Sequence, residues 1–240
     1  MKPLEILECT LRDGSYSIDH QFTAEDTAVI AAGLEEAGFR KIEIGHGLGL
    51  GASTPQFGVS AAPDEEYLEA AASSLTKARF GTFFIPGIAN HRHLELAAKY
   101  RASFVRIGTN VSETDQGEPF IKHAKELGME VSCNLMKTYA VPLDEVIRRS
   151  ERLVGWGADV ICIVDSAGGM LPTEVAEMVR RLRSALGVAI GFHGHNNVQL
   201  AIANTLMAVD AGASVVDTSL RGMGRSAGNA QTEVLVMLLH

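Results

Sequence analysis

Residues 160–195 read VICIVDSAGGMLPTEVAEMVRRLRSALGVAIGFHGH, and this stretch decides the fold. It begins with an apolar run, Val160–Ser166, continues through an amphipathic helical pattern, Pro172–Leu186, and returns to a second apolar run, Ala189–His195. Strands that are apolar on both sides are typical of a parallel sheet that is covered on both faces. The stretch therefore predicts a strand–helix–strand unit of an α/β fold.

The same alternation extends over the whole chain. Strands are expected at Leu4–Thr10, Lys41–His46, Arg79–Pro86, Phe104–Thr109, Glu130–Lys137, Val160–Ser166, Ala189–His195 and Val215–Leu220. Helices are expected at Ala24–Ala37, Asp64–Leu75, His91–Arg101, Pro119–Leu127, Leu143–Gly155, Pro172–Leu186, Leu200–Ala211 and from Thr232 to the end of the chain. Eight alternations without a long linker predict a single-domain (β/α)8 TIM barrel over residues 1–240. A doubly wound open sheet is the alternative, but the residues after the first strand, Arg12-Asp13-Gly14-Ser15, are not its phosphate-binding glycine loop.

Short local signals mark the helix boundaries. Thr23, Pro63-Asp64 and Pro172-Thr173 are typical of helix starts. Glycine follows several of the helices and is expected to supply the positive φ that turns the chain toward the next strand. These glycines are Gly38, Gly128, Gly157, Gly187 and Gly212.

Composition and charge argue against several classes of protein. Hydrophobic residues make up 46% and charged residues 21% of the 240 positions, as in ordinary globular proteins. The net charge of −8 disfavours nucleic acid and anionic membranes as partners. No apolar run approaches the roughly 20 residues needed to cross a bilayer. Cys9, Cys133 and Cys162 lie in apolar runs, which predicts buried free thiols, and with no signal peptide expected this favours a cytoplasmic location.

Two histidines at the end of a strand are the first candidates for chemistry. In this fold the active site lies at the carboxyl ends of the strands. Residues two apart in a strand face the same way, so His193 and His195, with Gly194 between them, can face one metal ion. Ordinary hydrogen-bonded histidines are the alternative interpretation.

Asp13, which follows the first strand, can join the two histidines because a single strand separates strands one and seven around the ring. Two histidines and one carboxylate leave coordination positions open on a metal ion. A 2-oxo acid could occupy them and have its keto group polarised by the ion. A structural ion pair between Arg12 and Asp13 at the rim of the barrel is the alternative.

Further polar residues are expected at the same rim, each with a structural alternative. His46 ends the second strand and is either a catalyst or a histidine bonded to a loop. Ser166 ends the sixth strand and either binds a carboxylate or forms a turn. Asn229 lies in a glycine-rich loop before the last helix, where backbone amides could bind an anion; a purely structural glycine loop is the alternative. Glu43 and Asp217 lie within strands and are expected to be polar residues of the barrel interior.

Five motifs lie at the expected strand ends: TLRDGS (residues 10–15), EIGHG (43–47), DSAG (165–168), HGHNN (193–197) and GMGRSAGNA (222–230). Together they resemble the metal-dependent pyruvate aldolases of the 4-hydroxy-2-oxovalerate aldolase type. That family belongs to a barrel superfamily with hydroxymethylglutaryl-CoA lyase and isopropylmalate synthase. The resemblance covers essentially the whole chain and implies a lyase that works through a metal-bound pyruvate enolate.

The resemblance also implies roles for individual residues. Arg12 would stabilise the enolate, Ser166 would contact the pyruvate carboxylate, and Asn229 matches an asparagine that approaches the metal in lyase relatives. The metal would be Mn²⁺, with Mg²⁺, Co²⁺ and Zn²⁺ as alternatives. Its ligands would be Asp13, His193 and His195.

The chain departs from the family pattern in two respects. The aldolases carry a histidine three residues after the metal aspartate, which handles the proton of the 4-hydroxyl group; this chain has Tyr16 there, a poorer base at neutral pH. His20 is the nearest alternative proton carrier, so both residues are catalytic candidates. The alternative for Tyr16 is packing of the loop, and the alternative for His20 is a histidine on the loop surface. The aldolases also continue into a C-terminal helical region that docks a dehydrogenase. Because that region is not visible here, no dehydrogenase partner is predicted.

The leading hypothesis is therefore a carbon–carbon lyase that cleaves or forms 4-hydroxy-2-oxo acids, with a pyruvate-like 2-oxo acid as its small-molecule substrate. A Claisen-type acyltransferase that joins acetyl-CoA to a 2-oxo acid is the second hypothesis, although only Gly47–Gly58 offers surface for coenzyme A. A decarboxylase of an oxaloacetate-like acid is chemically adjacent. A metal-binding barrel without turnover is the third hypothesis, and each is compatible with a homo-oligomer.

Overall fold

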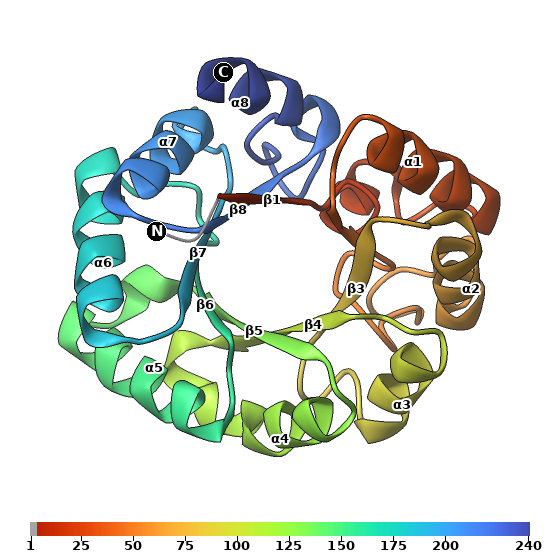
Figure 1. Cartoon of the computed structure of the whole chain (residues 1–240), viewed down its shortest axis with the longest axis horizontal. Helices are drawn as coiled ribbons and strands as arrows, with labels where there is room; N and C mark the ends of the chain where they lie inside the picture. Colours follow the sequence, from red (N-terminus) through yellow and green to blue (C-terminus); the bar gives the residue numbers. More distant parts are fainter. Residues whose placement is uncertain (1–3) are drawn as a thin grey trace.

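The chain forms a closed barrel of eight parallel strands in sequence order, which confirms the predicted (β/α)8 fold. The computed structural model describes residues 4–240. Figure 1 looks down the barrel and shows the ring of strands surrounded by a ring of helices. The strands are β1 (Glu5–Glu8), β2 (Lys41–Ile44), β3 (Arg79–Phe84), β4 (Phe104–Asn110), β5 (Glu130–Met136), β6 (Val160–Asp165), β7 (Ala189–Gly194) and β8 (Val215–Thr218).

Eight α-helices cover the outside of the barrel in the part of the chain that is described. They are α1 (Ala24–Glu36), α2 (Asp64–Ser74), α3 (His91–Lys99), α4 (Glu118–Glu126), α5 (Leu143–Trp156), α6 (Pro172–Ala185), α7 (Ala201–Ala211) and α8 (Thr232–Leu239). Four short 3₁₀ segments lie in the loops after the strands: η1 (Asp13–Ile18), η2 (Val111–Gly117), η3 (Thr138–Ala140) and η4 (Leu220–Gly222).

The local sequence signals place most helix boundaries correctly. Thr23 caps α1 through a capping box, since its hydroxyl accepts from Asp26 N at 3.0 Å and its own N–H donates to the Asp26 carboxylate at 2.8 Å. Four of the five expected glycines have positive φ, but Gly187 does not. There α6 ends at Ala185 and the capping residue Leu186 is already extended (φ −113°, ψ 141°), so the chain needs no left-handed residue to enter β7.

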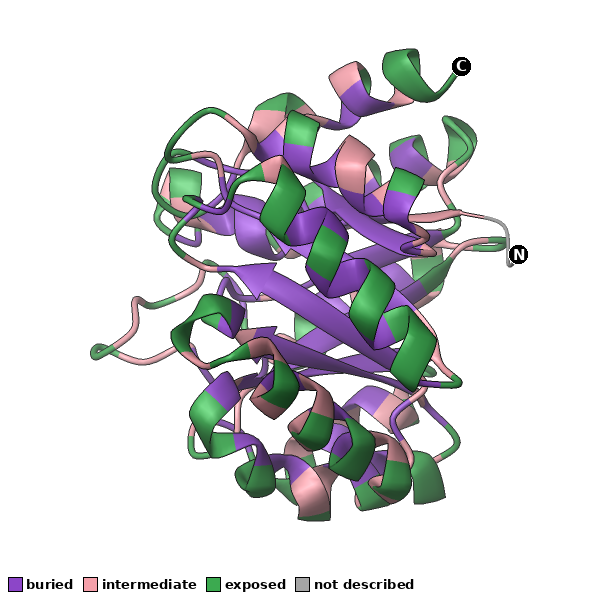
Figure 2. Ribbon diagram, turned by 90° about the vertical axis from the view of Figure 1, so that its left-hand side faces the viewer, coloured by how far each residue is buried: buried purple, intermediate pink, exposed green. Residues whose placement is uncertain are grey.

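Two apolar layers hold the barrel together. The larger one fills the space between the strands and the helices, and Figure 2 shows the strands buried while the outer faces of the helices are exposed. The smaller one fills the interior of the barrel and consists of Leu7, Cys9, Phe104, Val160 and Val215. The barrel is therefore a packed core, and its chemistry is confined to the ends.

Four charged residues close the amino-terminal end of the barrel. Lys41 Nζ contacts Glu5 at 2.8 Å and also pairs with Glu130. Arg79 bonds the same two carboxylates, each at 2.8 Å. Because Lys41 is 2% exposed, this ring of ion pairs is part of the packed structure at that end of the barrel.

The predicted state of the cysteines is confirmed, since Cys9, Cys133 and Cys162 are all buried and free. Within residues 4–240, no helix combines the length and the apolar character required to cross a membrane.

Candidate active site

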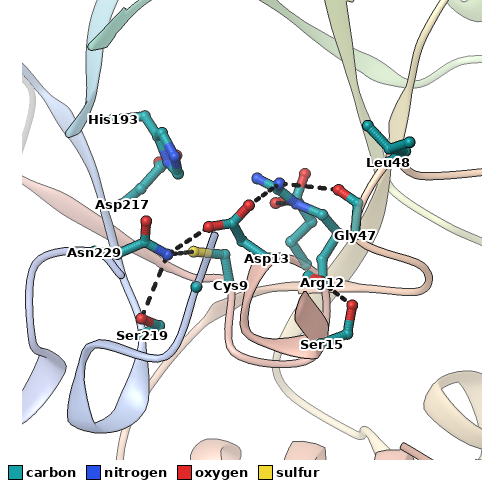
Figure 3. A network of polar contacts seen from close by, with 12 residues as sticks. Cys9, Arg12, Asp13, Ser15, Gly47, Leu48, His193, Asp217, Ser219 and Asn229 are labelled. Atoms are coloured by element: carbon teal, nitrogen blue, oxygen red, sulfur yellow. Dashed lines mark hydrogen bonds and ion pairs between the residues drawn. The ribbon is translucent and has the colours of Figure 1, made fainter. Parts of the chain in front are cut away.

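Asp13, His193 and His195 come together at the carboxyl ends of the strands, as the sequence predicts. Asp13 begins η1 directly after β1, and the two histidines lie at the end of β7. All three are buried, and one potential ligand atom from each lies within 4.8 Å of the others. Figure 3 shows Asp13 and His193 on facing sides of the site, with Asn229 beside them.

The donor atoms of this cluster fit a divalent metal ion. His193 Nδ1 lies 2.8 Å from Asp217 Oδ2, which leaves its Nε2 for a ligand. Nδ1 of His195 and Oδ1 of Asn229 are buried without a hydrogen-bond partner among the described residues. Burial and the neighbouring His193 lower the pKa of His195 to about 4, so its imidazole is neutral at neutral pH, as a metal ligand must be.

The loop that follows β8 supplies the wall of the site that carries Asn229. Asn229 Nδ2 donates to Asp13 Oδ2 at 2.7 Å and to the Met223 carbonyl at 3.1 Å, so it orients the carboxylate. The loop is tightly folded, because a Cβ at Gly228 (φ 85°) would lie 1.9 Å from the Gly222 carbonyl oxygen. Only glycine fits there, which explains its place in the motif.

Arg12 lies next to Asp13 and is 5% exposed. Its Nη1 donates to Asp13 Oδ1 and its Nε to Glu43 Oε2, each at 2.7 Å, and its guanidinium carbon lies 4.6 Å from the ring centre of Phe83. Burial would lower the pKa of Arg12, but Glu43 and Asp13 raise it above its usual value, so Arg12 remains charged. The ion pair considered from the sequence is present, and it lies within the metal-ligand cluster.

The same arginine controls the charge of Asp13. Burial alone would raise the pKa of this carboxyl group, but Arg12 and the two histidines hold the pKa below its usual range. Asp13 is therefore an ionised carboxylate at any pH near neutrality, as a metal ligand requires.

A polar layer lies directly beneath the cluster. Glu43 and Asp217 belong to it, so their expected place in the barrel interior is correct, and each bonds a residue of the site: Arg12 and His193 respectively. The third member, Arg106 of β4, was missed by the sequence analysis. Its signal was a charged residue in an otherwise apolar run that begins FVRI at residue 104.

Tyr16, His20 and His46 form an aromatic cluster beside the site. The ring centroids of Tyr16 and His20 are 4.9 Å apart in an edge-on arrangement, and His20 stacks on His46 at 3.8 Å. Tyr16 is partly buried, and burial raises the pKa of its hydroxyl despite the opposing charge of Arg12. The phenol therefore stays protonated, which suits a hydrogen-bond donor better than a base.

His46 is held entirely by the loop that follows β2. Its Nδ1 accepts from Leu48 N at 3.0 Å, which makes Nε2 the donor to the Gly58 carbonyl at 3.1 Å. Burial and the adjacent His20 lower its pKa to about 4. Both ring nitrogens are thus used by the loop, and this arrangement favours the loop-bonded histidine over the catalyst.

Ser166 lies at the end of β6, where the sequence places it. Its Oγ accepts from Lys137 N at 3.0 Å, so its proton is free for a further acceptor such as a substrate carboxylate. The preceding Asp165 instead accepts from the backbone of Gly169 and Met170, at 3.2 and 2.9 Å, and holds the loop before α6.

A closed barrel with two histidines and a carboxylate at its carboxyl-terminal end defines a TIM-barrel enzyme with a metal-type site. A family profile described as HMGL-like matches residues 3–240, and the chain belongs to this family. The relatives below identify it as an enzyme, a carbon–carbon lyase of the aldolase type.

Two relatives from the comparison illustrate the similarity in sequence. The chain is 46% identical to a 4-hydroxy-2-oxovalerate aldolase of Carboxydothermus hydrogenoformans, over 99% of this chain and 71% of the relative. It is 45% identical to a protein of the same name from Geobacillus thermodenitrificans, over 98% of this chain and 68% of the relative.

Solved structures agree on the fold. The HMG-CoA lyase of Bacillus subtilis superposes with a TM-score of 0.81 at 22% identity, covering 100% of this chain and 86% of that one. The carboxyl transferase domain of Rhizobium etli pyruvate carboxylase gives a TM-score of 0.85 at 18% identity, covering 99% and 43%. At this identity the two likenesses show the shared barrel alone.

Proposed function

We propose that this enzyme cleaves and forms 4-hydroxy-2-oxo acids, with pyruvate as the common product and nucleophile. The observation that carries the proposal is the buried Arg12, whose guanidinium is held 2.7 Å from Asp13 inside the cluster of candidate ligands. A fixed positive charge at that place suits an oxyanion that develops on the keto oxygen of a 2-oxo acid. The names of the relatives support the same class of substrate.

A divalent ion, for which we propose Mn²⁺ ahead of Mg²⁺, Co²⁺ or Zn²⁺, would act at this site as a Lewis acid toward the keto group. Its holders would be Asp13, His193 and His195, and Asn229 would orient Asp13 and offer a further oxygen. Arg12 would bind the enolate oxygen of pyruvate, and the free proton of Ser166 would bind its carboxylate.

Cleavage breaks the bond between C3 and C4 of the substrate. The electron pair passes to the enolate of pyruvate, the 4-hydroxyl group loses its proton to a base as the aldehyde forms, and C3 is then protonated. We assign the hydrogen-bonding role to Tyr16, because its raised pKa keeps the phenol protonated, and the base to His20. His20 carries a lowered pKa through burial and is therefore neutral and able to accept a proton.

Exchange of the C3 protons of pyruvate in deuterium oxide, followed by NMR, tests the role of Arg12. Arg12→Ala should slow exchange by roughly 10²-fold or more while metal binding is retained, the loss expected for one oxyanion donor. Arg12→Lys should recover only part of the exchange rate, because an ammonium group cannot reproduce the planar fork of the guanidinium group. The exposed Arg148 provides the matched control, Arg148→Ala. Wild-type exchange rates in Arg12→Ala would refute the role.

Elemental analysis of reconstituted protein tests the metal site independently of any substrate. We expect about one divalent ion per chain in wild type, and its loss in the double variant His193→Ala/His195→Ala. The exposed His91 on α3 gives the control, His91→Ala. Unchanged metal content in the double variant would place the ion elsewhere.

A further inference from the structure

Arg106 spans the interior of the barrel beneath the candidate active site. It lies in the middle of β4 and is 1% exposed. Its Nη1 donates to Glu43 Oε2 of β2 at 2.9 Å, and its Nη2 bonds Asp217 Oδ2 of β8. One planar guanidinium therefore joins two carboxylates that come from strands not adjacent to its own.

Each carboxylate uses the same oxygen for Arg106 and for a residue of the site. Glu43 Oε2 also accepts from Arg12 Nε at 2.7 Å, and Asp217 Oδ2 lies 2.8 Å from His193 Nδ1. The other oxygens, Glu43 Oε1 and Asp217 Oδ1, are buried without a partner among the described residues. The orientation of each carboxylate thus depends on the oxygen that it shares with Arg106.

We infer that Arg106 is a positioning residue that fixes Arg12 and His193 relative to each other. The part of this inference that concerns Arg12 rests on the proposed function, whereas the part that concerns His193 does not. Without Arg106, two buried carboxylates would lose the cation that they share, and with it the hydrogen bond that fixes the orientation of each. The imidazole of His193 would then lose the acceptor that directs its Nε2 toward the ligand cluster.

Electrostatics and geometry predict opposite effects on metal affinity, which makes the test decisive. Removal of a buried positive charge would by itself strengthen the binding of a cation. Loss of the orientation of His193 would weaken it, and changes in such outer-shell partners typically cost about 10–100-fold in affinity. Weaker binding therefore reports lost positioning and not a change in charge.

Lys41 offers a matched control at the other end of the same barrel. It is also a buried cation that joins two carboxylates, those of Glu5 and Glu130, and it is 2% exposed. It has no contact with the site in the described structure. Lys41→Met should therefore lower stability as Arg106→Met does, yet leave metal affinity unchanged.

The experiment titrates Mn²⁺ and Co²⁺ into metal-free wild type, Arg106→Met, Arg106→Lys and Lys41→Met. Arg106→Met should bind Mn²⁺ about 10-fold or more weakly and should alter the visible spectrum of bound Co²⁺. Arg106→Lys should recover part of the affinity, because a point charge reaches the two carboxylates less well than a fork. Nitrogen-15 NMR of the metal-free histidines should show a changed hydrogen bond at Nδ1 of His193 in Arg106→Met and an unchanged one in Lys41→Met.

Equal or tighter Mn²⁺ binding by folded Arg106→Met overturns the inference. If that variant does not fold, Arg106→Gln takes its place, since its amide can bond one of the two carboxylates but not both. The two proposals can also fail separately. If Arg106→Met weakens Mn²⁺ binding but the wild-type protein exchanges no pyruvate protons, the inference about His193 stands and the proposed function is overturned. The two failures are therefore distinguishable.

Discussion

The hydroxyl of Ser15 lies 3.0 Å from Nδ1 of His20 and donates its own proton to the Arg12 carbonyl at 2.7 Å. Because that proton is already used, Ser15 can only accept from His20, so Nδ1 of His20 carries the proton and Nε2 keeps its lone pair. The backbone reinforces the arrangement, since His20 adopts a left-handed conformation (φ 62°) and donates from its N–H to the Ser15 carbonyl at 2.8 Å. A left-handed backbone conformation is strained for a residue other than glycine, and here it accompanies the contacts that hold His20 in one tautomer.

His20→Asn should lower the cleavage of 4-hydroxy-2-oxo acids by roughly 10²-fold, the effect of losing a general base. Metal content and pyruvate proton exchange should remain near wild type. Burial lowers the pKa of His20, so in wild type the rate should fall on acidification only below the ordinary value for histidine, about pH 6.5. Ser15→Ala should cause a smaller loss and move this acidic limb, whereas His91→Asn should change neither. Full turnover in His20→Asn would exclude it as the base.

Tyr16 offers a test of a single hydroxyl group. Tyr16→Phe should lower turnover while exchange and metal content stay largely unchanged, because the ring remains and only the hydrogen bond is lost. Tyr16→His should raise the rate of cleavage, because an imidazole titrates near neutral pH and can act as a base there. The phenol of Tyr16 cannot, because its pKa is raised above the ordinary value. Steady-state kinetics on a panel of 4-hydroxy-2-oxo acids measures both. Unchanged turnover in Tyr16→Phe would make the hydroxyl irrelevant and leave a packing role.

Glu8 should make the stability of the protein depend on pH. It is fully buried, accepts from Thr10 Oγ1 at 2.6 Å and Thr232 Oγ1 at 3.1 Å, and burial raises its pKa to about 7. A raised pKa in the folded state means that its stabilising contribution is complete below the unfolded pKa, about 4.5, and is lost as the pH rises through about 7. The free energy of unfolding of Glu8→Gln relative to wild type should therefore increase between about pH 5 and pH 8, by on the order of 2–3 kcal/mol.

Urea unfolding of metal-free protein with a chelator present measures this difference without a contribution from metal binding. The exposed Glu66 on α2 gives the control, because Glu66→Gln should follow wild type at every pH. A pH-independent difference between Glu8→Gln and wild type would show that Glu8 is ionised in the folded protein throughout.

The sequence was informative where chemistry follows from strand alternation. His193 and His195 had to face one side, and Asp13 had to leave a strand two places away around the ring, so their meeting was predictable. Contacts across the barrel were not predictable in this way. Arg106 reaches β2 and β8, and its partners depend on the shear of the closed barrel, which no local pattern reveals.

The role of His46 was open for a similar reason. Its acceptor, the Gly58 carbonyl, lies twelve residues along a loop without regular structure, so the bond depends on the path of that loop. Gly187 shows a different limit of the sequence signals. A glycine after a helix suggests a left-handed turn, but after α6 the capping residue is already extended, so no such turn is needed there.

The buried charges around the ligand cluster have a consequence for the choice of substrate. Three carboxylates, Asp13, Glu43 and Asp217, are joined to only two guanidinium groups, so the cluster is one positive charge short of neutrality. A divalent ion would turn that deficit into a single surplus positive charge. A monocarboxylate cancels it, whereas a dicarboxylate brings a second charge that nothing in the cluster offsets. The site would therefore select 2-oxo acids by the number of their carboxylate charges as well as by their shape.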